Sequence, residues 1–195
     1  MPRTQYIFID YENVSVSDLS RAAGKNVRVI LLTGTQHKKL PVSLFLFAQE
    51  NPGVLKIIQT PVQGTNALDL VLSLEAGRVL AADPSGYIHI ISKDNDFESV
   101  IRHLQLETRL VARHPSLEEV PALRTPEERI ARLRSELADD SKSRPRTRKT
   151  LENKILSAFD QQATPEFIEK TIAAFIKAGL LDFTDTGKVL YSSAA

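Results

Sequence analysis

Two aspartates, Asp94 and Asp96, closely follow an apolar segment and flank a single asparagine. The segment, residues 87–91, has the composition of a buried strand, so Asp94 is expected at the rim of a sheet. Asp96 is expected on the first turn of the next helix, where backbone N–H groups stabilise an anion. If Asn95 caps that helix and Glu98 completes a capping box, one polar residue is explained. Capping does not explain why an aspartate stands on each side of the cap.

Two further aspartates are candidates for the same site. Asp10 follows three apolar residues at the end of a second strand-like run; the alternative is that Asp10 or Asn13 only forms a turn or caps a helix. Asp69 lies in a strongly apolar helical segment, on one stripe with Ser73 and beside Asn66. A partly buried carboxylate needs a partner, and a metal ion shared with other carboxylates is one. A solvent-facing Asp69 is the alternative.

Carboxylates gathered at one place favour a divalent cation. Two of them ~4 Å apart repel by about 1 kcal/mol in water and about 4 kcal/mol near a protein surface. The chain has no cysteine, which leaves carboxylates, carbonyls and four histidines as ligands. Oxygen-only ligands suit Mg²⁺ or Mn²⁺. Such an ion can polarise a phosphodiester, help generate a hydroxide and stabilise the leaving oxygen, so the sequence predicts metal-dependent phosphoester chemistry.

Other chemistries fit the composition poorly. Glycoside hydrolysis also uses paired carboxylates, but aromatic residues make up only 6% of the chain and tryptophan is absent, which leaves little surface to stack on a sugar. The histidines lack metal-ligand spacing, and His89 is expected to be a structural residue of a strand. No apolar stretch approaches the roughly 18 residues of a membrane span, and the start does not resemble a signal peptide. A cytoplasmic protein without membrane contact is expected.

A parallel sheet with helices on both faces would bring the four aspartates together. Nearly continuous apolar runs, typical of strands buried on both faces, alternate with helix-like segments. The expected strands are residues 6–9, 27–32, 54–58, 87–91 and 108–111, and the expected helices are residues 15–23, 42–49, 66–80 and 97–106. This order predicts an α/β fold with about five parallel strands sandwiched by helices. In such folds chemistry collects at the carboxyl ends of the strands.

Three motifs resemble those of a known family. The run Ile7-Phe-Ile-Asp10-Tyr-Glu-Asn13 resembles the D-x-x-N opening strand of NYN domains, a branch of the PIN-like nucleases. Ser92-Lys-Asp94-Asn-Asp96-Phe97 resembles that family's S-x-D-x-D-F, and Asn66-Ala-Leu-Asp69 stands where the family has its middle helix carboxylate. The resemblance covers about residues 5–113 and implies a PIN-like domain at 1–124. It also implies a metal-dependent ribonuclease in which four residues bind Mg²⁺ or Mn²⁺ and act in catalysis: Asp10, Asp69, Asp94 and Asp96.

The resemblance also implies supporting residues. Asn13 would orient a ligand water or a carboxylate, with Asn66 beside the helix aspartate. Glu12 is an additional candidate acid, and the alternative is that it only belongs to an exposed loop. The chain departs from the family where many members carry Lys-Gly before the helix aspartate, because Gln63-Gly64-Thr65-Asn66 stands there. It departs again at Lys93, which replaces a frequent glycine and is a candidate nucleic-acid contact. The alternative is therefore a non-catalytic PIN-like protein that binds nucleic acid or has a regulatory role.

Residues 125–149 are expected to be a charged helix followed by a basic linker. Thr125 is a plausible N-cap ahead of Pro126 at the first helical position. The stretch 141–149 then carries five positive charges and no negative one. It is typical of a solvated linker, and it also favours nucleic acid, since Lys and Arg release phosphate counterions on binding. The candidate contacts are Arg144, Arg146, Arg148 and Lys149.

Residues 150–195 are expected to form a small C-terminal module. Helices at 151–159 and 165–178 precede two strands, 180–184 and 188–191, that flank a turn. Helix, helix and hairpin resemble a truncated winged-helix module, which often binds nucleic acid through its second helix. That helix has Lys170 and Lys177 against Glu166 and Glu169, so it is not a basic surface. A protein partner or a homodimer through this module is as plausible as RNA, or DNA, binding.

Overall fold

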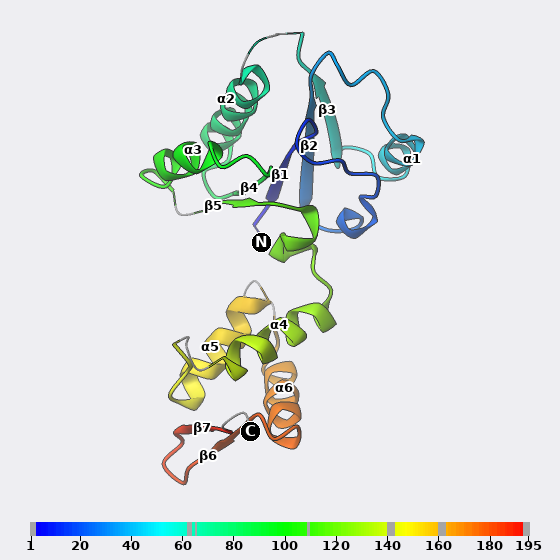
Figure 1. Ribbon diagram of the computed structural model, residues 1–195. Helices are drawn as coiled ribbons and strands as arrows, with labels where there is room; N and C mark the ends of the chain where they lie inside the picture. Colours follow the sequence, from blue (N-terminus) through cyan, green and yellow to red (C-terminus); the bar gives the residue numbers. More distant parts are fainter. Residues whose placement is uncertain are drawn as a thin grey trace. The chain divides into compact units, whose positions relative to one another are not determined.

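The computed structural model describes residues 3–61, 64, 66–108, 110–139, 143–159 and 163–192. The chain divides into two compact units, Met1–Leu123 and Arg124–Ala195. The first unit is built on five parallel strands in the order β3-β2-β1-β4-β5 (Figure 1). The strands are β1 (Gln5–Asp10), β2 (Val27–Thr33), β3 (Leu55–Gln59), β4 (Tyr87–Ile91) and β5 (Val111–His114). The predicted α/β fold with a parallel sheet is confirmed.

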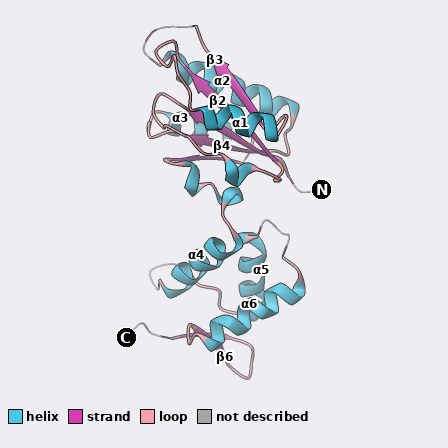
Figure 2. Ribbon diagram, turned by 90° about the vertical axis from the view of Figure 1, so that its right-hand side faces the viewer, coloured by secondary structure: helices cyan, strands magenta, loops and turns pink. Residues whose placement is uncertain are grey.

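Helices cover both faces of this sheet (Figures 1 and 2). Successive residues of a strand point to opposite faces, so strands that are apolar at every position bury both. Phe8 belongs to the core under α2 and α3, whereas Ile7 and Ile9 belong to the core under α1 and three short 3-10 turns. These elements are α1 (Val42–Glu50), α2 (Ala67–Ala82), α3 (Phe97–Leu104) and the turns Ser20–Ala22, Leu117–Glu119 and Pro121–Leu123.

The predicted helix at residues 15–23 is wrong. Only the 3-10 turn Ser20–Ala22 forms there, and the Asp18 side chain accepts the backbone N–H of Ser20 at 2.8 Å. Val14 and Val16 are buried in the core although their backbone is not helical. The apolar residues with helix-like spacing therefore belong to a loop that packs its side chains against one face of the sheet.

The fifth strand was predicted three residues too early, at 108–111. In the structure β5 is Val111–His114. Thr108 lies beyond the end of α3, and its N–H donates to the carbonyl oxygen of Leu104, the last residue of that helix, at 2.9 Å. Its side-chain oxygen then accepts the N–H of Leu110 at 3.1 Å, which turns the chain toward the sheet.

His89 is a structural residue, as its place in a strand predicts. Its ring nitrogens contact the side chains of Gln5 at 2.9 Å and His114 at 3.0 Å, and its ring stacks on Tyr87. Burial, followed by the charge of His114, lowers the pKa of His89 to about 3. The imidazole is therefore neutral at physiological pH and packs as part of the sheet.

The second unit consists of three helices and a hairpin. They are α4 (Pro126–Ala138), α5 (Arg148–Ala158), α6 (Pro165–Lys177), β6 (Leu181–Phe183) and β7 (Val189–Tyr191). The side chain of Thr125 caps α4 by accepting the N–H of Glu128, as the sequence predicts, and Thr164 caps α6 in the same way. Helix α4 shares one apolar core with α5 and α6 through Leu133 and Leu137, so it is part of this unit and does not stand apart from it.

The basic stretch before α5 is paired with the hairpin. Thr147 forms an antiparallel bridge with Lys188, and the N–H of Val189 donates to the carbonyl oxygen of Arg146 at 3.0 Å. Positions 141 and 142 lie outside the described residues. Within the segment that the sequence suggested as a solvated linker, Arg146 and Thr147 are therefore a short strand-like piece of the second unit, and Arg148 and Lys149 begin α5. No helix in the described parts of either unit is long and apolar enough to span a membrane.

Candidate functional site

The strands that end in acidic residues are neighbours in the sheet. β1 pairs in parallel with β4, with Ile9 opposite Ile91, so Asp10 and Ser92 leave the sheet at the same edge. The hydroxyl of Ser92 donates to Oδ2 of Asp10 at 2.8 Å. Because parallel strands share one carboxyl edge, two positions 82 residues apart in the chain meet directly.

Asp10 is fully buried and held by four hydrogen bonds. Its Oδ1 accepts the backbone N–H groups of Glu12 at 3.2 Å and of Asn13 at 3.3 Å. Its Oδ2 accepts the Asn13 side-chain amide at 2.6 Å as well as the Ser92 hydroxyl. A buried carboxylate survives without a basic partner when donors satisfy its oxygens. Asn13 therefore orients Asp10.

The loop after β4 arranges its aspartates by short backbone contacts. The Asp94 N–H donates to the Ser92 hydroxyl oxygen at 3.0 Å, and the Asp96 N–H donates to Oδ1 of Asp94 at 2.8 Å. Asp96 is the N-cap residue of α3. The alternative, a capping box formed by Asn95 and Glu98, is not present, because no side chain caps this helix.

Asp69 lies on the first turn of α2, which contacts β1. Burial, followed by the negative charges of Asp10, Asp94, Glu12 and Asp96, raises the pKa of Asp69 to about 6. Asp69 therefore shares an electrostatic environment with the other acidic residues proposed from the sequence as metal ligands or supporting acids. Ser73, on the same stripe, donates to the backbone oxygen of Asp69 at 2.7 Å and leaves its carboxylate alone.

Three predicted supporting residues have distinct placements. Asn66 is the N-cap position of α2 in the left-handed conformation, with φ 59°, and its side chain makes no capping hydrogen bond. Glu12 rests on Gly34 at the end of β2, where a Cβ would stand 2.0 Å from the Glu12 Oε1. Lys93 is exposed. Gln63 and Thr65, which stand near the family's Lys-Gly, lie outside the described residues.

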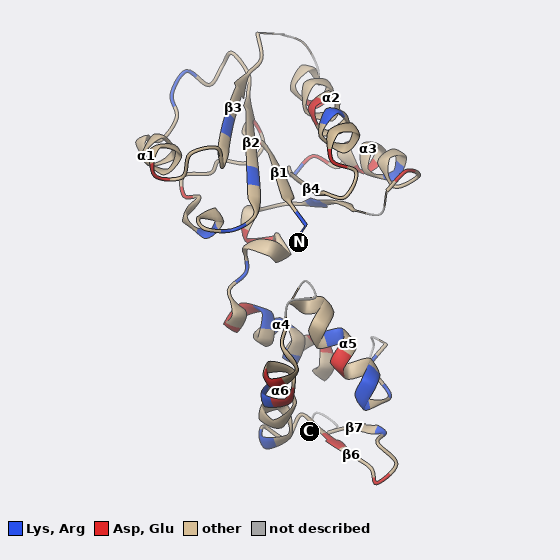
Figure 3. Ribbon diagram, turned by 180° about the vertical axis from the view of Figure 1, so that it is seen from behind, with Lys and Arg blue, Asp and Glu red and all other residues tan. Residues whose placement is uncertain are grey.

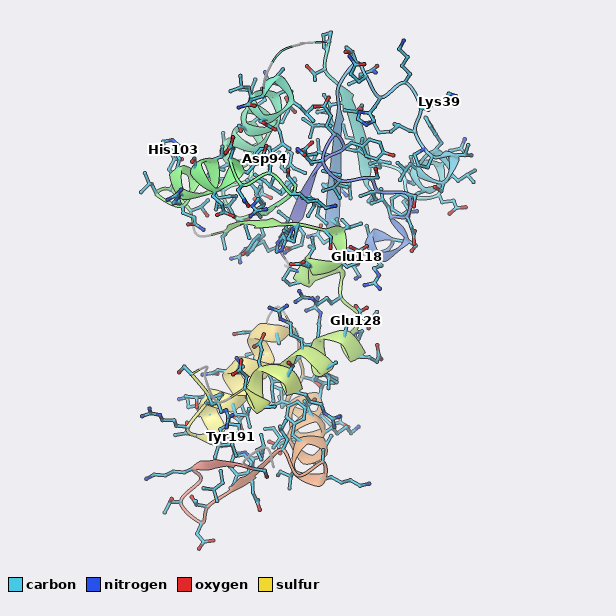
Figure 4. The ribbon with its side chains drawn as sticks, viewed as in Figure 1. Lys39, Asp94, His103, Glu118, Glu128 and Tyr191 are labelled. Atoms are coloured by element: carbon cyan, nitrogen blue, oxygen red, sulfur yellow. The ribbon has the colours of Figure 1, made fainter. Side chains whose placement is uncertain are left out.

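The donor set fits a hard divalent cation. Every acidic side chain at this edge offers oxygen, and the pKa of Asp69 is raised first by burial and then by the neighbouring negative charges. Among the described residues, no group of three or more His, Asp or Glu side chains is close enough to hold an ion as it stands. Figure 4 labels Asp94 on the β4–α3 loop of this edge. The edge therefore offers the oxygen ligands that Mg²⁺ and Mn²⁺ prefer.

The raised pKa of Asp69 gives a prediction for the metal-free protein. A carboxyl NMR titration should place its midpoint at about 6, and added Mg²⁺ should lower the midpoint because a cation favours the charged form. Between the ordinary aspartate pKa and about 6, the folded protein keeps a proton that the unfolded chain has lost. The contribution of Asp69 to stability should therefore fall as the pH rises through that range. A midpoint near 4 would show that the carboxylates are not crowded.

Two residues at this edge were not chosen from the sequence. Ser92 links Asp10 to Asp94 through its hydroxyl, and it is the serine of the S-x-D-x-D-F motif, to which the sequence alone assigned no role. Arg113 donates to Ser92, Asn95 and Glu98, and no local pattern in the sequence pointed to it.

The comparisons with known proteins agree with this architecture. A family model described as "PIN domain" matches residues 4–114, which include all of β1 through β5. Neither the curated proteins nor the solved structures gave a match. PIN domains in general are nucleases that act on nucleic acids with divalent metals. Because the match spans more than half of the 195 residues and the sheet has the expected parallel order, this chain belongs to the PIN domain family.

Proposed function

We propose that this protein is a metal-dependent ribonuclease of the NYN branch of PIN domains. Hydrolysis of phosphodiester bonds would take place at the carboxyl edge of the sheet, with four catalytic and metal-binding residues: Asp10, Asp69, Asp94 and Asp96. The observation that carries the proposal is the convergence of Asp69 with Asp10 and Asp94, three carboxylates from separate elements whose charges act on one another. Like charges gathered at one place destabilise the fold, and a bound divalent cation would offset that cost.

Each residue of the proposed site would have a defined role. Asp10 is held by Asn13 and Ser92, so one wall of the site is fixed before any ligand arrives. Asp69 and Asp94 would complete the cation site with Asp96. A bound Mg²⁺ or Mn²⁺ supplies charge stabilisation to the phosphate oxygens and favours formation of a hydroxide nucleophile. Glu12, resting on Gly34, would assist as a further acid at the rim, and exposed Lys93 would approach the substrate phosphates.

The test uses the wild-type chain. Mn²⁺ and Mg²⁺ should raise its melting temperature, because an ion that binds only the folded state stabilises it. The same ions should support cleavage of a fluorescent single-stranded RNA, and EDTA should stop it; the DNA of equal sequence should be cleaved more slowly. A melting temperature that neither ion changes would refute the metal site.

One set of observations favours the non-catalytic alternative. Both oxygens of Asp10 already accept two hydrogen bonds each, and no described group of three acids is in metal-binding geometry. Stabilisation by Mn²⁺ without cleavage of RNA or DNA would therefore identify a PIN-type protein that binds nucleic acid without turnover.

We also propose that the second unit is a winged-helix-like module with α4 as its first helix. The order of its elements supports this: α4, a strand-like piece at Arg146 and Thr147, α5, α6, then the β6–β7 hairpin, with the piece bridged to β7. The module is then not truncated, since the helix that the sequence suggested as a separate segment supplies its first element.

Within this module the basic residues divide into two groups. Arg148 is paired with Glu152 at 3.1 Å and Glu169, and Arg144 donates to the carbonyl oxygens at the end of α4 and stacks over Tyr191. Both are therefore engaged within the fold and are weaker candidates for nucleic-acid contacts. A second group is exposed and has no side-chain partner among the described residues; it is called the wing patch here and consists of Arg146, Lys149 and Lys188.

We propose that the wing patch binds the phosphates of RNA. The bridge between Thr147 and Lys188 places the basic start of α5 beside the basic end of the hairpin (Figure 3). Unpaired cations suit a phosphate backbone, where counterion release drives binding. A protein partner or a second copy of the chain is the alternative, and it would use the exposed apolar side chains of Ile176 and Leu190.

A further inference from the structure

Arg113 binds the loop that carries two of the site's aspartates. It lies on the edge strand β5, opposite Ile90 of β4, and its side chain is 16% exposed. Nε donates to Glu98 Oε1 at 2.8 Å, Nη1 donates to the carbonyl oxygen of Ser92 at 3.0 Å, and Nη2 donates to Oδ1 of Asn95 at 2.9 Å. Every nitrogen of the guanidinium is therefore used on one short segment.

The three acceptors bracket the two aspartates along the chain. Ser92 precedes Asp94, Asn95 separates Asp94 from Asp96, and Glu98 follows on the first turn of α3. Ser92 is also the residue whose hydroxyl joins Asp10 to the Asp94 backbone. The guanidinium thus bonds to the backbone of Ser92 before the aspartates, to the side chain of Asn95 between them and to the side chain of Glu98 after them, and it does not bond to the carboxylate of Asp94 or Asp96. This placement also explains why an asparagine stands between two aspartates: its amide oxygen is an acceptor for Arg113.

We propose that Arg113 is a positioning residue that sets the geometry of Asp94 and Asp96. The inference rests on the proposed metal-dependent function, because that function gives the geometry its purpose. Without an ion, the carboxylates at this edge repel one another, and the loop that carries two of them must be held in place. A planar guanidinium can hold the loop because its three nitrogens donate in fixed directions. A lysine ammonium is a point charge and cannot reproduce that donor geometry.

The contribution of Arg113 is geometric more than electrostatic. Its charge is matched by Glu98, so the pair adds little net charge to the acidic edge. The pKa of Asp69 responds to four carboxylates, and Arg113 is not among the charges that shift it. Substituting lysine, which keeps the charge, should therefore impair the loop nearly as much as removing the charge altogether.

The experiment compares Arg113→Lys with the wild type in two measurements. The first is amide hydrogen exchange in metal-free protein at Asp94 and Asp96, whose N–H groups bond within the loop. We expect exchange at both amides to be at least about ten-fold faster in the variant, because the loop opens more often. The second is the Mn²⁺ dissociation constant, which should rise by about 10–100-fold, as when an outer-shell partner of a ligand is lost. Arg132→Lys, at an exposed helical pair with Glu136 in the other unit, is the matched control and should change neither.

Asn95→Ala keeps the Arg113–Glu98 pair and removes only the middle acceptor, so it provides a test if the lysine variant fails to fold. It should raise exchange at Asp96 while leaving the melting temperature of the metal-free protein near that of the wild type. Wild-type exchange and wild-type Mn²⁺ affinity in Arg113→Lys would overturn the proposal. If the wild type itself binds no Mn²⁺, the metal-dependent function fails, and the exchange measurement still decides whether Arg113 holds the loop.

Discussion

Asp94→Asn is expected to remove both the stabilisation by Mn²⁺ and the cleavage of RNA while the fold stays intact. Asparagine keeps an Oδ1 acceptor for the Asp96 N–H, which Asp94 accepts at 2.8 Å, so the loop retains its internal hydrogen bond. What disappears is one negative charge at the edge. We expect cleavage to fall by about 10²–10³-fold, the usual cost of losing one electrostatic contribution in a preorganised site. The melting temperature with and without Mn²⁺, and the cleavage rate of the labelled RNA, measure the two effects.

The same variant should make the metal-free protein slightly more stable. The charge of Asp94 is one of those that raise the pKa of Asp69, so its removal should lower the NMR titration midpoint of Asp69. Asp18→Asn is the control within the same unit, because Asp18 is exposed and only caps the turn at Ser20. It should respond to Mn²⁺ as the wild type does. Wild-type cleavage by Asp94→Asn would defeat the assignment of the site.

The sequence was sufficient to predict the sheet because burial on both faces leaves a strong pattern. Strands such as β2 are apolar at nearly every position, as is typical of a parallel sheet that is covered on both faces. Because the strands are parallel, their carboxyl ends lie at one edge of the sheet, and Asp10 and Asp94 each stand at or just after such an end. Asp69 could be added because a carboxylate in an otherwise apolar helix needs an explanation. These inferences rest on periodicity and topology, which a single sequence carries.

The contacts that depend on distant residues were not predictable in the same way. Asn95 and Glu98 have the spacing of a capping box, and that local pattern gave the wrong partner because Arg113, 18 and 15 residues further on, binds both. The segment at 15–23 has helical spacing but is held by the core of the sheet instead. In the second unit, the bridge between Thr147 and Lys188 joins positions far apart in the chain, so a basic stretch looked like a linker. Tertiary contacts override local propensity in each case.

Reversing charge on the wing patch should weaken RNA binding strongly. In the double variant Arg146→Glu/Lys188→Glu, two exposed cations without side-chain partners become anions, so the fold should be unaffected and the phosphates should be repelled. We expect the dissociation constant for a single-stranded RNA, measured by fluorescence anisotropy in EDTA, to rise by about ten-fold or more. The dependence of log K on log salt should flatten by about 0.7 for each lost phosphate contact. EDTA prevents cleavage, so the measurement does not depend on the proposed catalysis.

The matched control is Lys170→Glu/Lys177→Glu, which makes the same change of charge on α6. This helix is where a winged-helix module often contacts nucleic acid, but its Lys170 is paired with Glu166 at 2.8 Å and its surface is mixed in charge. If the wing patch binds RNA, the α6 variant should keep most of its affinity and its salt slope. The reverse result, with loss of affinity in the α6 variant alone, would move the interface to the helix and reject the wing patch. Unchanged affinity in both variants would show that neither the wing patch nor α6 binds the RNA, and it would reject the wing patch.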